Sequence, residues 1–547
     1  MKINRNTQWI KLLFLVVILM LGGSTLPKVV WGHASLEKAV PEANSQLQES
    51  PPSISLVFNE RLDDGLYYIK LLNQNGNEAT SNKAVINQQH NGIELAVPKL
   101  AEGIYVVSYH VISSDGHPIS GTYPIIIGNP PESELQAPIK SSLTIDPHEH
   151  GGAGAYSISM ILQYLSRGLW YLTMLALTGW IVWLRLIRKD ASQIRKDLQF
   201  WTLNLQRAHL IAFLLLIFTH LEDLLGSQGI DQLFNFFTGT SVGINWLMLL
   251  GLSLLGFILL QRASWLDYLW VISLLAVKSF NGHAITFSPK VLTVLLDFIH
   301  LAAAAIWVGG LLMLAVRWKH SEQGTFLFLK AFSKAALASI IVLTLSGSAS
   351  VLLFLPNLRY LTYSQWGIWL LIKIGVVGLV LVVAGILRYT MKKQREANIR
   401  RWFKIDFSLM LAIIVLVGFI SYMSPIPTNK PLAWHVMGTE AHMSADITPK
   451  IQGTNTFIAK AWLPESLGKP KYVQMILTYM DDEEIAPIVV PLEPFTDKTQ
   501  EESFGFAKYS YKAVGAYLPF RGNWSIQVRV MDSTDTERPY ESTFIVY

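Results

Sequence analysis

The pattern of apolar and polar residues changes twice along the chain. Between residues 33 and 128, short alternating runs such as 54–58 and 104–109 are separated by Gly, Asn and Pro. Runs of this length and period predict the strands of a small β-sandwich or barrel. A linker is expected over 129–155. Alternation returns between 425 and 547, for example in 472–479, and predicts a second β-sandwich.

The middle of the chain, 156–424, is dominated by apolar segments that are long enough to cross a bilayer. A spanning helix needs about 20 residues. We therefore expect a bundle of eight transmembrane α-helices, in which the fourth segment is the shortest. The segments lie near 161–184, 208–225, 242–261, 265–281, 291–316, 332–355, 366–387 and 406–424.

Basic residues in the loops predict the orientation of this bundle. The loops after the first, fifth and seventh segments are basic, whereas 226–241 has no Lys or Arg and 356–365 has Arg359 alone. The positive-inside rule then places the basic loops in the cytoplasm and both β-domains outside the cell. The formal net charge of +5 reflects this topology, so no nucleic-acid partner is expected.

Residues 1–32 have the pattern of a signal peptide. Lys2, Arg5 and Lys11 accompany an apolar run over 12–21, and Gly32 is a small residue before the expected cut. The hydrophobic share of 51% agrees with a multi-pass protein of the cell membrane. Cleavage after Gly32 would make His33 the N-terminal residue.

The first β-domain carries a candidate metal site. The α-amine and imidazole of an N-terminal His33 can chelate one ion, and Asp115 and His117 add a carboxylate and a second imidazole. Three nitrogens and one oxygen in a plane suit Cu(II). Asp115 and His117 are two residues apart, so on an extended segment they face one side, with Gly116 allowing a tight turn. The chain has no cysteine, which excludes thiolate ligands.

These residues resemble the copper-binding family CopC. The resemblance is carried by His-Ala-Ser-Leu at 33–36 with Pro41, by Leu-Val-Phe-Asn-Glu at 56–60, and by the stretch 109–121, which contains Ser-Ser-Asp-Gly-His-Pro-Ile-Ser-Gly. It implies a Greek-key β-barrel that binds Cu(II) through the His33 amine and imidazole, Asp115 and His117. Glu60 is our candidate for orienting one of the bound imidazoles.

Ionisable side chains inside the apolar segments are candidate functional groups, because charges within a bilayer are costly. Asp297 and His300 are three residues apart and share a helix face. Lys373 is similarly deep and can pair with Asp297, either as a structural pair or at a proton site. We expect copper to pass along His220, His283 and His300; His209 is a weaker candidate near the cytoplasmic end.

The helical region resembles the CopD family of copper-transport membrane proteins. Asn-Gly-His-Ala at 281–284 and the stretch 297–311 carry the resemblance, with weaker support from Phe332-Ser333, 344–347 and Lys373. The whole arrangement resembles the CopC/CopD fusion copper transport proteins of the YcnJ-like type, and this resemblance implies copper import.

Two further groups of residues are weaker candidates. His435, Met437, His442 and Met443 cluster after the last apolar segment, where imidazoles and thioethers can bind either copper oxidation state or stand there incidentally. His148 and His150 in the linker are similar.

Copper uptake without enzymatic turnover is the leading hypothesis. Transport would be passive or coupled to a gradient, because the sequence has no nucleotide-binding motif. An extracellular copper donor or reductase is an expected partner, beside the copper ion and membrane lipid. The alternatives are a tolerance protein that sequesters copper without import, a copper-dependent oxidoreductase, and haem-linked electron transfer. Asp115 argues against the oxidoreductase, since it would fill the position that oxygen needs.

Overall fold

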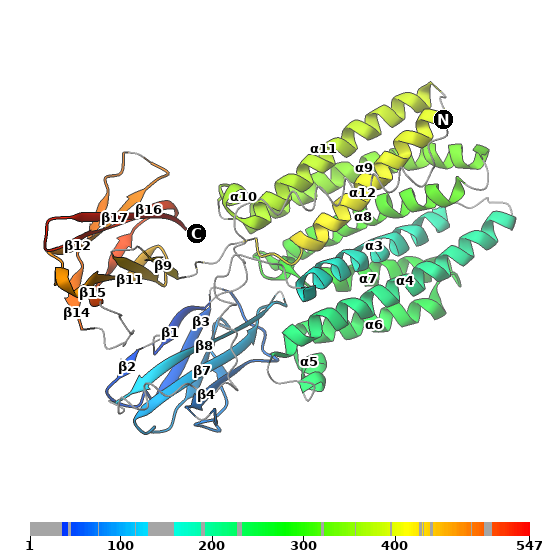
Figure 1. Cartoon of the computed structure of the whole chain (residues 1–547). Coiled ribbons are helices and arrows are strands. Elements are labelled where there is room, and N and C mark those ends of the chain that lie inside the picture. Colours follow the sequence, from blue (N-terminus) through cyan, green and yellow to red (C-terminus); the bar gives the residue numbers. More distant parts are fainter. Residues whose placement is uncertain are drawn as a thin grey trace. The chain divides into compact units, whose positions relative to one another are not determined.

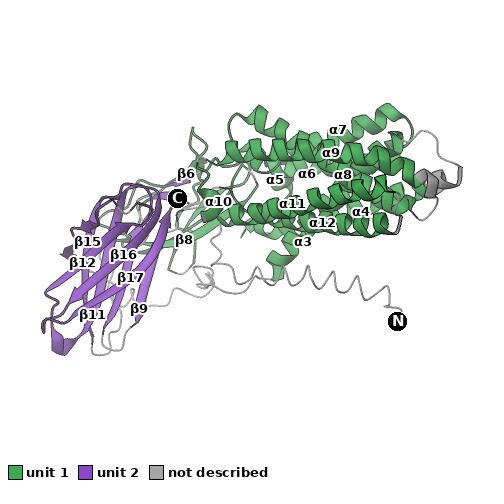
Figure 2. Cartoon of the chain, turned by 90° about the horizontal axis from the view of Figure 1, so that it is seen from above, with its two compact units in different colours: residues 1–34, 40–55, 60–426 green, residues 35–39, 56–59, 427–547 purple. Residues whose placement is uncertain are grey.

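The structure is a computed structural model that describes most of the chain after residue 35. The described residues are 36–547 without 42–44, 59, 75, 115, 129–157, 187–191, 227–231, 319–321, 356, 394–395, 426–428, 430, 438–440, 483 and 497–505. The expected signal peptide, His33, Asp115, His148 and His150 therefore lie outside the described residues. Two compact units are distinguished in Figure 2: residues 1–34, 40–55 and 60–426, and residues 35–39, 56–59 and 427–547.

The N-terminal β-domain consists of two four-stranded sheets, with orders β1-β3-β6-β5 and β2-β8-β7-β4. Alternation of apolar and polar residues produces this fold, since in β3 every second residue is buried. Strands β7 and β8 form a long antiparallel hairpin. Its outermost pair is Gly103 with Ile127, and the pair next to the turn is Ile112 with Pro118. The strands are β1 (Leu36–Val40), β2 (Gln46–Leu47), β3 (Ser53–Phe58), β4 (Tyr68–Asn73), β5 (Val85–Ile86), β6 (Gly92–Ala96), β7 (Gly103–Ile112) and β8 (Pro118–Ile127).

The helical region contains all eight expected long helices, which run alongside one another (Figure 1). Seven of the described helices are long and apolar enough to span a membrane. The long helices are α3 (Ile158–Leu186), α4 (Ser192–Leu225), α6 (Ser241–Leu259), α7 (Ser264–Ser279), α8 (Lys290–Arg317), α9 (Glu322–Phe354), α11 (Gln365–Lys392) and α12 (Glu396–Ile420).

The helix count differs from the expected eight, because the described residues of this region form ten α-helices. The additional ones are α5 (Leu233–Gly239) and α10 (Tyr360–Tyr363), of 7 and 4 residues. A search for apolar runs of about 20 residues does not find such short helices. The fourth expected segment forms α7, which has 16 residues and is shorter than a typical span. The short 3₁₀ helix η5 (His283–Ile285) follows it.

The C-terminal domain is a β-sandwich, as its alternating pattern predicts. Its five-stranded sheet has the order β14-β15-β11-β10-β9 and its four-stranded sheet the order β13-β12-β16-β17. Buried Met443, Phe457 and Trp524 belong to its core. The strands are β9 (Leu432–Met437), β10 (His442–Thr448), β11 (Gly453–Pro464), β12 (Tyr472–Tyr479), β13 (Ile488–Val490), β14 (Glu493–Phe495), β15 (Phe506–Leu518), β16 (Gly522–Met531) and β17 (Glu537–Val546).

Candidate metal centre

His117 lies in the tight turn that joins β7 to β8. The Ser113 amide donates to the His117 carbonyl at 2.9 Å, and the Gly116 amide donates to the Ser113 carbonyl at 2.9 Å. Gly116 has φ +90°, a conformation that favours glycine. The tight turn expected at Gly116 is present, whereas Asp115 lies outside the described residues, so the expectation that it faces the same side as His117 stays a prediction.

Aromatic side chains of the helical region surround the His117 imidazole, which is 3% exposed. The ring of His283, in η5, stacks on it with centroids 5.8 Å apart. The ring of Tyr422, just after α12, meets it edge-on at 5.0 Å. The expected metal ligand of the β-domain is therefore in contact with an expected copper-path histidine of the helical region.

Tyr422 connects this pair to a second histidine. Its ring lies 5.8 Å from the ring of His220 near the end of α4. It also lies 5.5 Å from the ring of Tyr164 and 4.9 Å from the Arg167 guanidinium carbon, both on α3. We call His117, His220, His283 and Tyr422 the junction cluster. Four segments that are distant in the sequence meet there.

The hydrogen bonds of His220 leave one ring nitrogen suited to bind a metal. Nδ1 lies 2.9 Å from the Leu216 carbonyl oxygen, which only accepts, so Nδ1 carries the proton and donates. Nε2 then holds a lone pair, and among the described residues this buried atom has no hydrogen-bond partner. A neutral imidazole anchored through one nitrogen is the usual form of a histidine metal ligand.

His300, on α8, has the same arrangement. The Ser346 hydroxyl donates its single proton to the Val342 carbonyl at 2.7 Å, so towards His300 it can only accept. His300 Nδ1, 2.9 Å from Ser346 Oγ, must therefore donate to it. Nε2 of His300 is left with a lone pair. His300 lies about 10 residues, or roughly 15 Å, along α8 from its first turn, deeper than the junction cluster.

Asp297 is part of a charged group between the junction cluster and His300. It interacts electrostatically with Lys278, His283 and Lys373, and the nearby Ser279 hydroxyl donates to the Leu275 carbonyl at 2.9 Å. Lys373 and Asp297 influence each other electrostatically, while their direct pairing stays a prediction; Lys278 is a further cation of this group that was not expected from the sequence. His209 is separate from these residues, because its Nε2 lies 3.1 Å from Ser253 Oγ on α6.

A cavity of about 130 Å³ lies between α8, α9, α11 and α12. Trp307, Arg388 and Asp406 are among its lining residues. Asp406 is 4% exposed, and Arg388 donates to the Ser333 hydroxyl at 3.1 Å. Neither Asp406 nor Arg388 was expected as a site residue, although Asp406 begins the last apolar segment and Arg388 directly follows the seventh.

Glu60 lies close to the turn of His117 along the backbone. The next residue, Arg61, accepts a hydrogen bond from the Ser114 amide at 2.8 Å, and Leu62 forms a bridge with Ser113. The strand pairing thus brings the segment after Glu60 beside residues 113–114. The expected role of Glu60 in orienting a bound imidazole stays a prediction.

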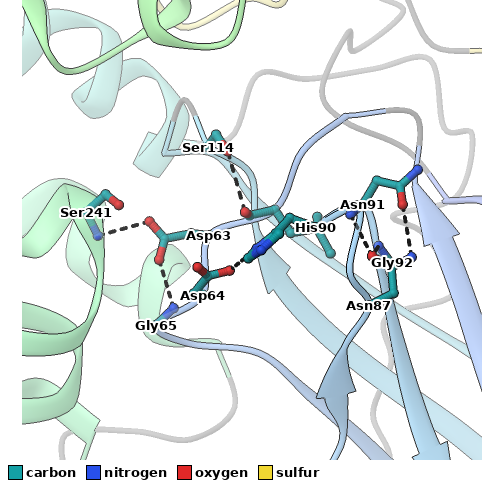
Figure 3. Close-up of polar contacts among 10 residues, drawn as sticks. Asp63, Asp64, Gly65, Asn87, His90, Asn91, Gly92, Ser114 and Ser241 are labelled. Atoms are coloured by element: carbon teal, nitrogen blue, oxygen red, sulfur yellow. Dashed lines mark hydrogen bonds and ion pairs between the residues drawn. The ribbon is translucent and has the colours of Figure 1, made fainter.

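The β-domain contacts the helical region through a buried carboxylate (Figure 3). Asp63 Oδ2 accepts a hydrogen bond of 2.9 Å from the Ser241 amide, at the start of α6, and Oδ1 accepts one of 2.8 Å from the Gly65 amide. A carboxylate at a helix N-terminus is stabilised by the helix dipole. A Cβ on Gly65 would overlap the Gly239 backbone, so the contact requires glycine. Nearby, His90 Nδ1 pairs with Asp64 Oδ1 at 2.6 Å.

His110 is a second contact between the two regions. It is fully buried, its Nε2 donates to the Leu224 carbonyl at the end of α4 over 3.2 Å, and its Nδ1 lies 2.7 Å from Ser120 Oγ. The ring also stacks on Tyr68 at 5.6 Å. Burial lowers the pKa of His110 below its ordinary value of 6.5. His110 is thus a packing histidine that joins the β-domain to the end of α4.

This lowered pKa predicts that the protein loses stability in mild acid. The unfolded chain binds a proton at His110 at a higher pH than the folded chain does, so stability falls as the pH drops below about 6.5. We expect the unfolding temperature of the detergent-solubilised protein to fall between pH 7.5 and 5.5, and to fall less for His110→Gln, which does not titrate. An equal fall in both proteins would contradict this assignment.

The C-terminal candidates separate into two groups. Met443 is fully buried in the sandwich core, so it points away from His442, the residue before it. Successive residues of a strand face opposite sides, so Met443 does not share the face of His442 although it follows it in the sequence. Met437 is 76% exposed and lies directly opposite His442 in the β9–β10 ladder.

Comparison with known proteins agrees with these domains. The CopC domain model matches residues 36–128, and the Copper resistance protein D model matches 326–420, which covers α9 to α12. The chain is 26% identical over 483 residues to Copper transport protein CutJ of Bacillus subtilis, covering 83% of this chain and 85% of CutJ. It is 35% identical over 97 residues to Protein YobA of Escherichia coli K12, covering 17% of this chain and 77% of YobA.

Two solved structures are similar to the N-terminal β-domain. CopC from Methylosinus trichosporium OB3b is 30% identical, with a TM-score of 0.17, and the match covers 17% of this chain and 93% of that one. PcoC, a methionine-rich copper resistance protein from Escherichia coli, is 27% identical, with a TM-score of 0.16, and the match covers 17% and 98%. This chain therefore joins a CopC domain and a Copper resistance protein D domain on one polypeptide, and its similarity to CutJ extends over most of both chains.

Proposed function

We propose that the chain takes up copper, by capturing Cu(II) at the N-terminal β-domain and passing copper through the helical region into the cell. The capture ligands would be the His33 amine and imidazole, Asp115 and His117, a donor set that suits Cu(II). Uptake by this route requires both β-domains to lie outside the cell, which is the orientation that the distribution of basic loops favours. CutJ is named a copper transport protein, which supports the same function.

The observation that carries the proposal is the contact between His117 and His283. A copper ion leaving His117 finds an imidazole with its ring centre 5.8 Å away. A bare ion in the bilayer is very costly, so a transport path must supply ligands at each step. His220 offers its Nε2 lone pair beside Tyr422, and His300 offers another deeper in α8. We propose His283, His220 and His300 as the successive ligands.

The charged group around Asp297 supports the passage of a cation. A carboxylate within the helical region offsets the charge of copper, and Lys278 and Lys373 offset the carboxylate when copper has left. Cytoplasmic copper is mostly Cu(I), so one electron must reach the ion. We assign this electron to an extracellular reductase or reduced copper donor. No substrate turnover is proposed for the chain itself.

Cell copper content tests the direction of transport. Cells grown at limiting copper would carry the intact gene, a deletion, or His117→Ala. Uptake predicts that the deletion and His117→Ala both lower cell copper. His90→Ala is the matched control, because His90 pairs with Asp64 in the same domain and lies outside the junction cluster. Unchanged or raised copper in the deletion would overturn import and favour sequestration or export.

A further inference from the structure

The outer face of the five-stranded C-terminal sheet gathers two histidines and a methionine. His442 on β10 lies directly opposite Met437 on β9, and paired residues point to the same side of a sheet. His435 is two residues before Met437 and therefore shares this face. Ala445 and the fully buried Met443 occupy the opposite face, in the core.

The two imidazole rings of this group lie close together and nearly parallel. The imidazoles of His435 and His442 stand 6.5 Å apart between centroids, with planes inclined by 4°. Trp462 of β11 meets the His435 ring edge-on at 5.8 Å, and Phe506 meets the His442 ring at 4.9 Å. His442 Nδ1 is buried, and no described residue forms a hydrogen bond with it. The thioether of Met437 is open to an incoming ion, because this residue is 76% exposed.

The chemistry of these side chains selects a soft monovalent ion. An imidazole nitrogen binds a metal at about 2 Å, so small rotations of the two rings allow both to reach one ion between them. Thioether and imidazole ligands suit Cu(I), whereas Cu(II), Zn(II) and harder ions favour carboxylate or additional nitrogen ligands. The buried indole of Trp462 can stabilise a cation through its ring.

The charges on the same face agree with this selection. Lys460 lies opposite Ser444 on the neighbouring strand, and Lys508 lies opposite Trp462. These ammonium groups disfavour a divalent ion more than a monovalent one. Asp446 also lies on this face, about 13 Å along the strand from His442; it is two residues beyond Ser444, the partner of His435, on the side of His435 away from His442.

We propose that His435, His442 and Met437 form a Cu(I) site on the C-terminal domain, with Trp462 beside it. The site uses none of the residues of the capture site or of the junction cluster, and it does not depend on the direction of transport. Its chemistry complements that of the N-terminal domain, since one end of the chain offers hard ligands for Cu(II) and the other soft ligands for Cu(I).

A competition titration tests this site in the full chain. The purified protein carries His117→Ala to remove the N-terminal site, and Cu(I) is added without oxygen against a coloured Cu(I) chelator. Adding His435→Ala or Met437→Leu should lower the affinity for one equivalent of Cu(I) at least about tenfold. Loss of a residue that only supports a metal ligand already costs about that much, and these residues are proposed as the ligands themselves. Met437 is exposed, so Met437→Leu leaves the fold unchanged.

Met443→Leu is the matched control, because it removes a thioether one residue from His442 but on the core face. It should leave the titration unchanged. X-ray absorption of the Cu(I) protein should show a sulfur neighbour that Met437→Leu removes and Met443→Leu does not. Equal competition by all variants, or a sulfur signal that persists in Met437→Leu, would overturn the proposal.

Discussion

Replacing His283 with alanine is expected to abolish copper accumulation while leaving Cu(II) bound to the N-terminal β-domain. The reason is the position of its ring, which stacks on His117 at 5.8 Å but belongs to the helical region. The capture ligands stay intact in this variant, whereas the first imidazole that receives copper is lost. Without that ligand the ion would have to enter a low-dielectric region uncoordinated.

Two measurements on the same variant check this expectation. Cu(II) affinity of the purified protein should equal that of the wild type, and cell copper at limiting supply should fall to the level of the deletion strain. His117→Ala should lose both properties, and His90→Ala neither. Normal accumulation with His283→Ala would show that copper bypasses this residue, and a loss of Cu(II) affinity would make His283 part of the capture site.

Gly309→Val is expected to prevent the helical region from folding. Gly309 on α8 faces Gly179 on α3, and the two helices touch through backbone atoms at this point. A Cβ at either position would overlap the backbone of the other helix, from which no flexible side chain can move away. Small residues permit such close helix packing in membranes. Overpacking costs about 1–3 kcal/mol when side chains can adjust, and the cost is larger where only backbone can move.

The yield of monodisperse protein after detergent extraction, together with its unfolding temperature, measures this effect. Gly378→Val on α11 is the matched control, because a Cβ there meets no atom within 4 Å. It adds the same side chain to another spanning helix and should leave both quantities near wild type. Equal yields for Gly309→Val and Gly378→Val would mean that α3 and α8 do not pack through these glycines.

Local patterns were sufficient to predict the long helices of this fold and the β-sheet character of its two end domains. The alternation in β3 and the apolar run of α8 depend on which side of a strand or helix is buried. That choice is made within a few neighbouring residues, so it can be read from the sequence. The same methods missed α5 and α10, because helices of 7 and 4 residues have no such run. The distribution of charge likewise predicts orientation through the loops alone.

Site residues could be predicted from the sequence only where their chemistry is unusual for its surroundings. Asp297, His300 and Lys373 are ionisable groups within apolar helices, and His117 lies in a distinctive turn motif. Tyr422 and Trp462 carried no comparable signal, since aromatic residues are common in helix ends and strands. Asp63 resembled any exposed loop carboxylate until its contact with the Ser241 amide was seen.

The sequence by itself determined the order of the domains, the spans and the types of ligand available, because these follow from composition and short-range periodicity. Only the tertiary structure decided which ligands meet. Packing of the β7–β8 turn, α4, η5 and the segment after α12 brings His117 and His220 to Tyr422, and His283 to His117. Strand register placed Met437 beside His442 and Met443 in the core. Such contacts join residues that are far apart in the chain, so they depend on how whole elements bury their surfaces together.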